Sequence, residues 1–329
     1  MINFLLFLNE KLEYFSLLWY NVGNFKGGIN VKVTTLSKRA FENLEPLALS
    51  REVLNTESII LKYSDKGKPK VIKRLFYQDG EVFANKLYTL EMLSTNSKNL
   101  PNSFLIPDSL ISVSGKIQGF TIPYMEGINF QTFLKNEKNP LEEKKYFLYK
   151  VGEILNQMKA IRNHTKLNDL YLCDLHASNF IVNPDNKEMG VIDLDSCKIQ
   201  GNKSSYSMFL NEFALLNNVK GKYRIVTDDS EKGYVTADEN SDLYCYNMML
   251  LSFLYGSTYI NSLPLETYYS YLNYLNDIGI KKELIDIFSD LVSNKPNENP
   301  FYIVSSLTEE QVCRAKCIVY KNVMKNKNR

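Results

Sequence analysis

The chain has 329 residues, of which 39 are Lys or Arg and 37 are Asp or Glu, so its formal net charge is +2. A charge so close to zero argues against a large nucleic-acid-binding surface and against a polybasic membrane anchor. Hydrophobic residues make up 44% of the chain and charged residues 23%, which are the proportions of ordinary globular proteins and exclude wholesale disorder.

The first 50 residues have no clear hydrophobic period, and we expect residues 1–50 to form an N-terminal extension. Their opening apolar run is broken by Glu10, Lys11 and Glu13, which favours an amphipathic helix or a poorly ordered segment over a targeting signal. No later stretch reaches the roughly 18 apolar residues that a membrane-spanning helix needs. Five cysteines, an odd number, argue against a disulfide framework, and we expect a cytoplasmic protein.

The segment after residue 51 has the pattern of a small β-rich lobe. Four runs have the composition of strands: 58–64, 70–77, 109–115 and 116–125. A polar turn with a glycine at 65–68 joins the first two runs into a predicted hairpin. Between the second and third runs, residues 81–94 carry apolar side chains at roughly helical spacing and predict one helix.

Beyond residue 128 the chain is predicted to be mostly helical. Residues 142–164 form a long amphipathic pattern, and residues 241–256 are apolar on most sides, as a buried helix is. A third helix is predicted over 307–324, with Thr308 as its N-cap. The predicted fold class is therefore α+β, with a small β-rich N-terminal lobe and a larger helical C-terminal lobe.

One short island of strands, residues 169–199, interrupts the helical half and carries three oxygen-bearing side chains. Asp174 is followed five residues later by Asn179 and then by an apolar strand, and after a turn a second apolar strand is predicted to end in Asp193. Because a turn joins the two strands, we expect these side chains to meet at one edge. Oxygen ligands suit Mg²⁺, and a carboxylate beside the ion can accept a proton from an attacking hydroxyl.

The island resembles the catalytic loop and metal-binding strand of the protein-kinase superfamily, in which D-x4-N is followed by an aspartate at the end of the next strand. The resemblance implies a bilobal fold, with ATP as the phosphate donor and Mg²⁺ as its metal. It also implies that Asp174 orients or deprotonates the acceptor hydroxyl, whereas Asn179 and Asp193 hold the metal. Without the resemblance, the two aspartates could instead be turn-capping residues.

Two further landmarks of this superfamily stand upstream of the island. Lys73, in the predicted strand VIKRL, has the place of the lysine that binds the α and β phosphates of ATP. Glu91, inside the predicted helix, has the place of the glutamate that pairs with this lysine, and its rival Glu81 falls at the helix start. A lysine in such a context is usually an exposed strand residue, so its assignment depends on the order of the landmarks along the chain.

The segment PYMEG resembles the hinge that binds adenine, with the carbonyl of Pro123 and the N–H of Met125 as the binding groups. Asp242, at the start of the buried helix, resembles the aspartate that braces the catalytic loop by hydrogen bonds. The landmarks predict an extension at 1–50 and a protein-kinase-like domain at 51–325, divided into an N-lobe at 51–122, a hinge at 123–127 and a C-lobe at 128–325.

The sequence departs from the superfamily pattern at several places. No glycine-rich loop precedes Lys73, and no A-P-E motif follows Asp193. Leu172 and Cys173 stand where His and Arg are usual, and the D-F-G motif reads D-L-D from Asp193. A phosphorylated activation loop therefore has no obvious arginine to dock on, and peptide recognition is not demonstrated.

The run DLHASN has His176 where kinases have a lysine, and it is closer to the D-L-H-P-x-N of aminoglycoside and choline phosphotransferases. His176 could brace the loop or contact a phosphate, and both interpretations stay open. The run IDLDS resembles the I-D-V-D-S of divergent bacterial protein-kinase-like proteins.

Composition and motifs together leave three hypotheses of function. The leading one is an ATP- and Mg²⁺-dependent phosphotransferase that acts on Ser or Thr of a protein. The second keeps the enzyme but makes the acceptor a small-molecule hydroxyl, which DLHASN and the missing A-P-E motif favour. The third is a pseudokinase, a binding module without turnover, which the missing glycine-rich loop favours. No nucleic-acid partner is expected under any of them.

Overall fold

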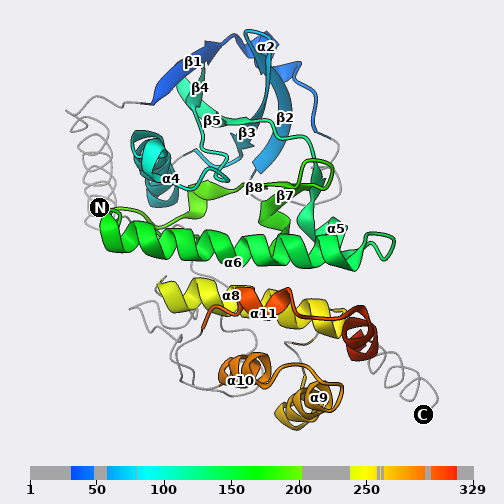
Figure 1. Ribbon diagram of the computed structural model, residues 1–329. Helices are drawn as coiled ribbons and strands as arrows, with labels where there is room; N and C mark the ends of the chain where they lie inside the picture. Colours follow the sequence, from blue (N-terminus) through cyan, green and yellow to red (C-terminus); the bar gives the residue numbers. More distant parts are fainter. Residues whose placement is uncertain are drawn as a thin grey trace, which may run out of the picture. The chain divides into compact units, whose positions relative to one another are not determined.

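A computed structural model describes residues 31–47, 58–78, 80–201, 238–257, 260, 263–292 and 298–316 (Figure 1). They form an α+β protein with a mixed five-stranded sheet. The described residues divide into two compact units, each considered by itself below. The first unit contains the described residues within 31–97 and 106–124, and the second those within 98–105 and 125–316.

The sheet of the first unit has the strand order β1-β4-β5-β3-β2. The elements of this unit are β1 (Lys32–Leu36), α2 (Lys38–Glu42), β2 (Ser58–Asp65), β3 (Lys68–Leu75), α4 (Gly80–Thr95), β4 (Ser109–Val113) and β5 (Lys116–Pro123). The predicted hairpin is confirmed as β2–β3, the two later strands as β4–β5, and the predicted helix as α4. The β2–β3 turn has positive φ at both Lys66 and Gly67, which a two-residue hairpin loop of this kind requires.

Residues 31–47 belong to the first unit, although the sequence analysis assigned them to an N-terminal extension. β1 pairs in parallel with β4, and Phe41 of α2 packs in a core cluster under the sheet. The other buried members of this cluster are Leu61, Ile72, Ile111 and Val113. The predicted boundary at residue 51 is therefore too late. A parallel pairing joins segments far apart in sequence, so no short turn marks β1 as a partner of β4.

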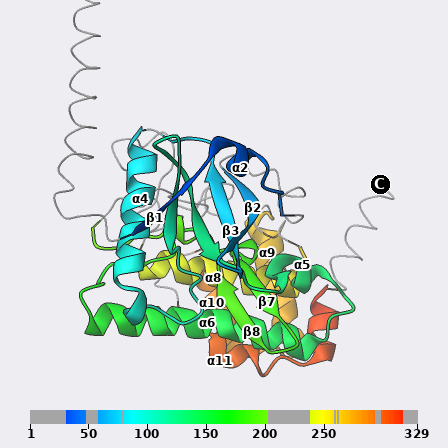
Figure 2. The same ribbon diagram turned by 90° about the horizontal axis from the view of Figure 1, so that it is seen from above.

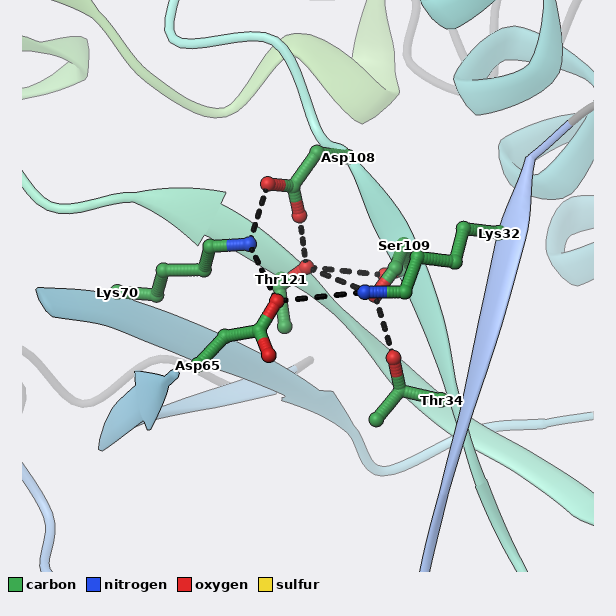
Figure 3. A network of polar contacts seen from close by, with 7 residues as sticks. All are labelled: Lys32, Thr34, Asp65, Lys70, Asp108, Ser109 and Thr121. Carbon is green, nitrogen blue, oxygen red and sulfur yellow. Dashed lines mark hydrogen bonds and ion pairs between the residues drawn. The ribbon is translucent and has the colours of Figure 1, made fainter. Parts of the chain in front are cut away.

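A polar network connects all five strands of this sheet (Figure 3), and its members are Lys32, Thr34, Asp65, Lys70, Asp108, Ser109 and Thr121. Lys70 Nζ lies 2.6 Å from Asp108 Oδ2 and 3.1 Å from Asp65 Oδ2. The bond to Asp108 raises the pKa of Lys70 even though burial opposes it, so the lysine is charged. Lys70 pairs with Pro123 in the β3–β5 ladder, so the network holds the backbone where the predicted hinge begins.

The second unit combines a three-stranded sheet, with the order β6-β7-β8, and most of the described helices. Its strands are β6 (Ile128–Asn129), β7 (Phe180–Asn183) and β8 (Glu188–Val191). Its helices are α5 (Phe130–Lys135), α6 (Leu141–His164), α8 (Glu239–Tyr255), α9 (Leu265–Asp277), α10 (Lys282–Asp290) and α11 (Phe301–Val304), and residues 309–316 are also helical. Short 3₁₀ helices among the described residues cover Ala177–Asn179 and Leu194–Ser196 in this unit, and Ser97–Asn99 where the chain passes from the first unit into it.

The long helices predicted at 142–164 and 241–256 are confirmed as α6 and α8. Thr308 caps the last helix as predicted, because its hydroxyl accepts the N–H of Gln311 at 3.2 Å. The remainder of that predicted helix, from residue 317, lies outside the described residues. No helix in the described part of the chain is both long enough and apolar enough to cross a membrane.

Helices α8 and α11 run beside α6 in both views (Figures 1 and 2). The close approach depends on Gly152 of α6, where an added Cβ would collide with Phe301 and with the Tyr246 hydroxyl. That hydroxyl donates to the Leu148 carbonyl oxygen at 2.9 Å. In the second unit α6 therefore packs against both α8 and α11.

Candidate functional site

The hairpin β7–β8 brings Asn179 and Asp193 to the same end of its two strands. Phe180 pairs with Val191, and the Ile192 N–H donates to the Asn179 carbonyl at 2.9 Å. Asn179 ends a 3₁₀ helix directly before β7, and Asp193 follows β8 as the cap of the next one. β8 ends at Val191, two residues earlier than the sequence predicted. Asp193 is thus displayed on a turn beyond the strand.

Asp174 lies at the same end and is held by two neighbours. The amide nitrogen of Asn179 donates to the Asp174 carbonyl oxygen at 2.8 Å and to its carboxylate Oδ2 at 3.2 Å. His176 Nε2 lies 3.3 Å from the other carboxylate oxygen, Oδ1. That oxygen is buried and accepts no hydrogen bond of good geometry from the described residues. These contacts commit the nitrogen of Asn179 to Asp174, so its carboxamide oxygen is the atom that could bind a metal.

A small cavity joins the three oxygen-bearing side chains. Asp174, Asn179 and Asp193 line it together with apolar neighbours, among them Leu172 and Phe180. The expected meeting of these side chains is therefore confirmed within the second unit. Apolar walls lower the local dielectric, which strengthens the interaction of the carboxylates with a cation or a proton.

Asp242 braces the segment before Asp174, as the sequence analysis predicted. Its Oδ2 accepts the N–H of Leu172 at 2.9 Å, and its Oδ1 accepts the N–H of Cys173 at 3.0 Å. Burial raises the pKa of Asp242 to about 6, although the two N–H groups act in the opposite direction. The capping box that Asp238 and Ser241 form at the start of α8 fixes the turn that carries Asp242.

Two residues of the site have left-handed backbone conformations that non-glycine residues rarely adopt. Cys173 has φ 67° and Asp193 has φ 63°. The Asp174 N–H donates to the Leu172 carbonyl at 2.8 Å, which makes residues 172–174 a strained γ-turn. Strain of this kind gathers at functional sites and persists where the surroundings impose it. The two bonds to Asp242 supply that constraint at Cys173.

Lys73 and Glu91 lie in the first unit, on β3 and α4. Lys73 is only 4% exposed, and its strand lies between β5 and β2 in the sheet. The general expectation of an exposed strand lysine is therefore wrong here, and a buried lysine requires a partner. Glu91 is also buried, in the C-terminal half of α4, and its pairing with Lys73 stays a prediction. The side chain of the rival Glu81 lies outside the described residues.

The predicted hinge spans the point where the two units meet along the chain. Pro123 ends β5, and the Tyr124 N–H donates to the Pro69 carbonyl at 3.4 Å. Met125 begins the second unit, and its sulfur lies against Gly190 of β8. The binding of adenine by Pro123 and Met125 stays a prediction.

The sequence analysis missed a set of contacts behind the site. Arg162, in the last turn of α6, bonds to Glu239 of α8 and to the carbonyl of Leu170. Glu239 stands three residues before Asp242, one turn away on the same helix face. That spacing was visible in the sequence and could have indicated a second anchor for the loop.

The donor set fits Mg²⁺ bound together with a phosphate ligand. Among the described residues, no group of three or more His, Cys, Asp or Glu side chains could hold a metal ion by itself. Mg²⁺ is usually held by one or two carboxylates, and substrate phosphates and water complete its shell. The Asp193 carboxylate and the Asn179 amide oxygen suit that partial role.

No protein-family model matches the chain, and no curated protein is similar to it. The resemblance to the protein-kinase superfamily therefore depends on the residues and contacts described above.

Proposed function

We propose that the protein is an ATP- and Mg²⁺-dependent phosphotransferase with a bilobal, protein-kinase-like fold, and that its acceptor is a Ser or Thr hydroxyl of a protein. The observation that carries the proposal is the arrangement of one loop. Asp242 holds the backbone before Asp174, Asn179 holds Asp174 itself, and Asp193 faces the same cavity. Few structural needs explain two buried polar residues, Asn179 and Asp242, and two partly buried aspartates gathered around a strained turn.

Each residue of the second unit has a definite role in this proposal. Asp174 accepts the proton of the acceptor hydroxyl, and its Oδ1 is the carboxylate oxygen that Asn179 does not bind. Asn179 and Asp193 hold Mg²⁺, which neutralises charge on the phosphates of bound ATP. In the first unit, Lys73 binds the α and β phosphates, and Glu91 holds Lys73. The backbone of Pro123 and Met125 binds adenine.

A small-molecule acceptor is the second candidate, and the contact between His176 and Asp174 favours it. A histidine here, in place of the usual lysine, is a feature that the run DLHASN shares with small-molecule phosphotransferases. A pseudokinase is the third candidate. It predicts nucleotide binding without transfer.

Transfer of labelled γ-phosphate separates the three. The full chain is incubated with labelled ATP, with and without Mg²⁺, in the presence of a protein mixture, an aminoglycoside or choline. We expect Mg²⁺-dependent labelling of protein on Ser or Thr, and the variant Asp174→Asn is the matched control. Labelling of the small molecules alone supports the second candidate. Binding of ATP in a thermal-shift assay without transfer to any acceptor or to water supports the third.

A further inference from the structure

The end of α6 and the start of α8 are joined through one arginine. Arg162 Nη2 lies 3.1 Å from Glu239 Oε2, and its Nη1 donates to the Leu170 carbonyl oxygen at 3.0 Å. Its guanidinium also stacks 4.7 Å from the centre of the Tyr171 ring. The side chain is only 8% exposed, so these contacts are made largely out of water. The planar guanidinium of Arg162 thus contacts two consecutive residues of the loop, Leu170 and Tyr171.

Glu239 is well suited to hold this arginine. Burial alone would raise the pKa of Glu239, but its bonds to Lys159 and Arg162 outweigh burial and lower it. The carboxylate is therefore charged near neutral pH. Lys159 Nζ lies 2.8 Å from Glu239 Oε1 but is 56% exposed, so its contribution is that of a surface ion pair.

Two anchors on one helix turn therefore hold four consecutive residues. Asp242 binds the N–H groups of residues 172 and 173. Glu239, acting through Arg162, holds residues 170 and 171. Tyr171 is also paired through both its backbone groups with Lys198, at 3.1 and 2.9 Å. Asp174 comes directly after this clamped segment.

We propose that Arg162 is a positioning residue for Asp174: by clamping Leu170 and Tyr171 against α8, it keeps the strained turn at Cys173 in place and so sets the position of the carboxylate. The effect of Arg162 on the rate of phosphate transfer rests on the proposed function. Its effect on the structure of residues 170–173 does not depend on that function. A misplacement of the reacting group by about 1 Å can cost on the order of 100-fold in rate.

The first test is amide hydrogen exchange of the full chain without nucleotide. Arg162→Met is compared with Lys159→Met, which removes an ion pair to the same Glu239 without touching the loop. Loss of a hydrogen bond to a charged group shifts an equilibrium by about 10-fold or more, so we expect protection of residues 171–173 to fall by about that factor in Arg162→Met. In Lys159→Met we expect a change of no more than about 3-fold. Amides of α9 and α10 should keep their protection in both variants.

Equal losses in the two variants would overturn the inference, as would a uniform loss that extends through α9 and α10. If Arg162→Met does not fold, Arg162→Lys replaces it. A lysine can satisfy Glu239 or the Leu170 carbonyl but cannot make the flat, forked contact with both. A smaller loss confined to residues 171–173 is then the supporting result, and wild-type protection there is the contrary one.

The second test is kinetic. Arg162→Met should lower kcat about 10-fold or more while KM for ATP stays unchanged, because it displaces the base and leaves the phosphate-binding groups intact. In an Asp174→Asn background the same substitution should have almost no further effect on transfer. An equal fold-loss in both backgrounds would contradict positioning through Asp174. If the wild-type protein transfers no phosphate, the proposed function fails, and the exchange result alone decides the role of Arg162.

Discussion

At the scale of single residues, Asp174 is held by more contacts than an ordinary surface aspartate needs. Asn179 bonds to both its backbone and its carboxylate, and His176 lies against the second carboxylate oxygen. The preceding turn is strained and is tied to Asp242. These several contacts together fix the direction of the Asp174 carboxylate, and proton transfer from an acceptor hydroxyl requires a fixed direction.

The substitution Asp174→Asn should therefore separate binding from chemistry. The amide keeps the size of the side chain and its bonds to Asn179 but cannot accept the proton. We expect ATP affinity to change little and phosphate transfer to fall by about 10²–10⁴-fold, the usual contribution of a general base. Isothermal titration and single-turnover transfer measure the two quantities. A parallel loss of ATP affinity would instead mean that Asp174 is a structural residue.

Asp193 tests the metal role at the same scale. Asp193→Asn removes one charged ligand from the cavity edge, and we expect the Mg²⁺ concentration needed for ATP binding to rise about 10–100-fold. The matched control is Asp185→Asn, the same substitution at an exposed position in the turn between β7 and β8. Unchanged magnesium dependence in the Asp193 variant would remove this residue from the metal site.

At the scale of elements, α6 illustrates how packing can override local preference. Alanine favours a helix over glycine by about 1 kcal/mol, so Gly152→Ala should stabilise an isolated α6. In the folded chain, the new methyl group meets Phe301, the Tyr246 hydroxyl and the Asn299 side chain. Overpacking costs about 1–3 kcal/mol, which we expect to exceed the gain in helix propensity.

We therefore expect Gly152→Ala to lower the free energy of unfolding, measured by urea denaturation, by on the order of 1 kcal/mol. Gln157→Ala, on the exposed side of the same helix, should change it by less than about 0.5 kcal/mol. A Gly152→Ala variant more stable than the wild type would show that α8 and α11 can move to accommodate the methyl group without loss of stability.

The elements that sequence could predict are those specified by local signals. The β2–β3 hairpin follows from its turn residues, and α6 and α8 follow from their apolar patterns. Asp242 could be assigned as the loop brace because it leads a buried helix. β1 could not be found, since its partner β4 lies more than seventy residues away in the chain. The Arg162 contacts were missed because the spacing of Glu239 and Asp242, although visible in the sequence, does not identify the arginine that Glu239 binds.

At the scale of the whole molecule, the division into units does not follow the order of the chain. Residues 98–105 stand between α4 and β4 in sequence, yet they belong to the second unit. There the Val191 N–H donates to the Ser103 carbonyl at 2.7 Å, and the Leu105 N–H donates to the Val191 carbonyl at 3.0 Å. The predicted N-lobe of residues 51–122 includes this segment, because no local sequence pattern shows that residues 98–105 belong to the second unit.

The pH dependence of global stability offers a test of the buried brace. The pKa of Asp242 is about 6 in the folded chain, against 3.8 for an ordinary aspartate. Between these values the folded state binds more protons than the unfolded state, so rising pH lowers stability through this group. The stabilisation that the raised pKa of Asp242 gives the folded state is fully present below about pH 4. It is lost as the pH rises through about 6, and stability then no longer changes through this group. A difference of about two pKa units corresponds to roughly 3 kcal/mol.

Asp242→Asn isolates this term, because the other titrating groups, including the neighbouring Arg162 and Asp238, are common to both proteins. Urea denaturation at pH 4.5 and pH 7.5 gives the free energy of unfolding of each. The variant should be less stable at pH 7.5, since its single amide oxygen cannot accept from Leu172 and Cys173 together as the two carboxylate oxygens do, and linkage makes the difference larger at pH 4.5. We expect the stability advantage of the wild type to shrink by up to about 3 kcal/mol from the lower to the higher pH. A constant advantage would mean that the two N–H bonds offset the effect of burial and leave the pKa of Asp242 unshifted. An advantage that grows with pH would mean that the two N–H bonds lower the pKa of Asp242 by more than burial raises it. The charged form of Asp242 would then be the form that stabilises the loop.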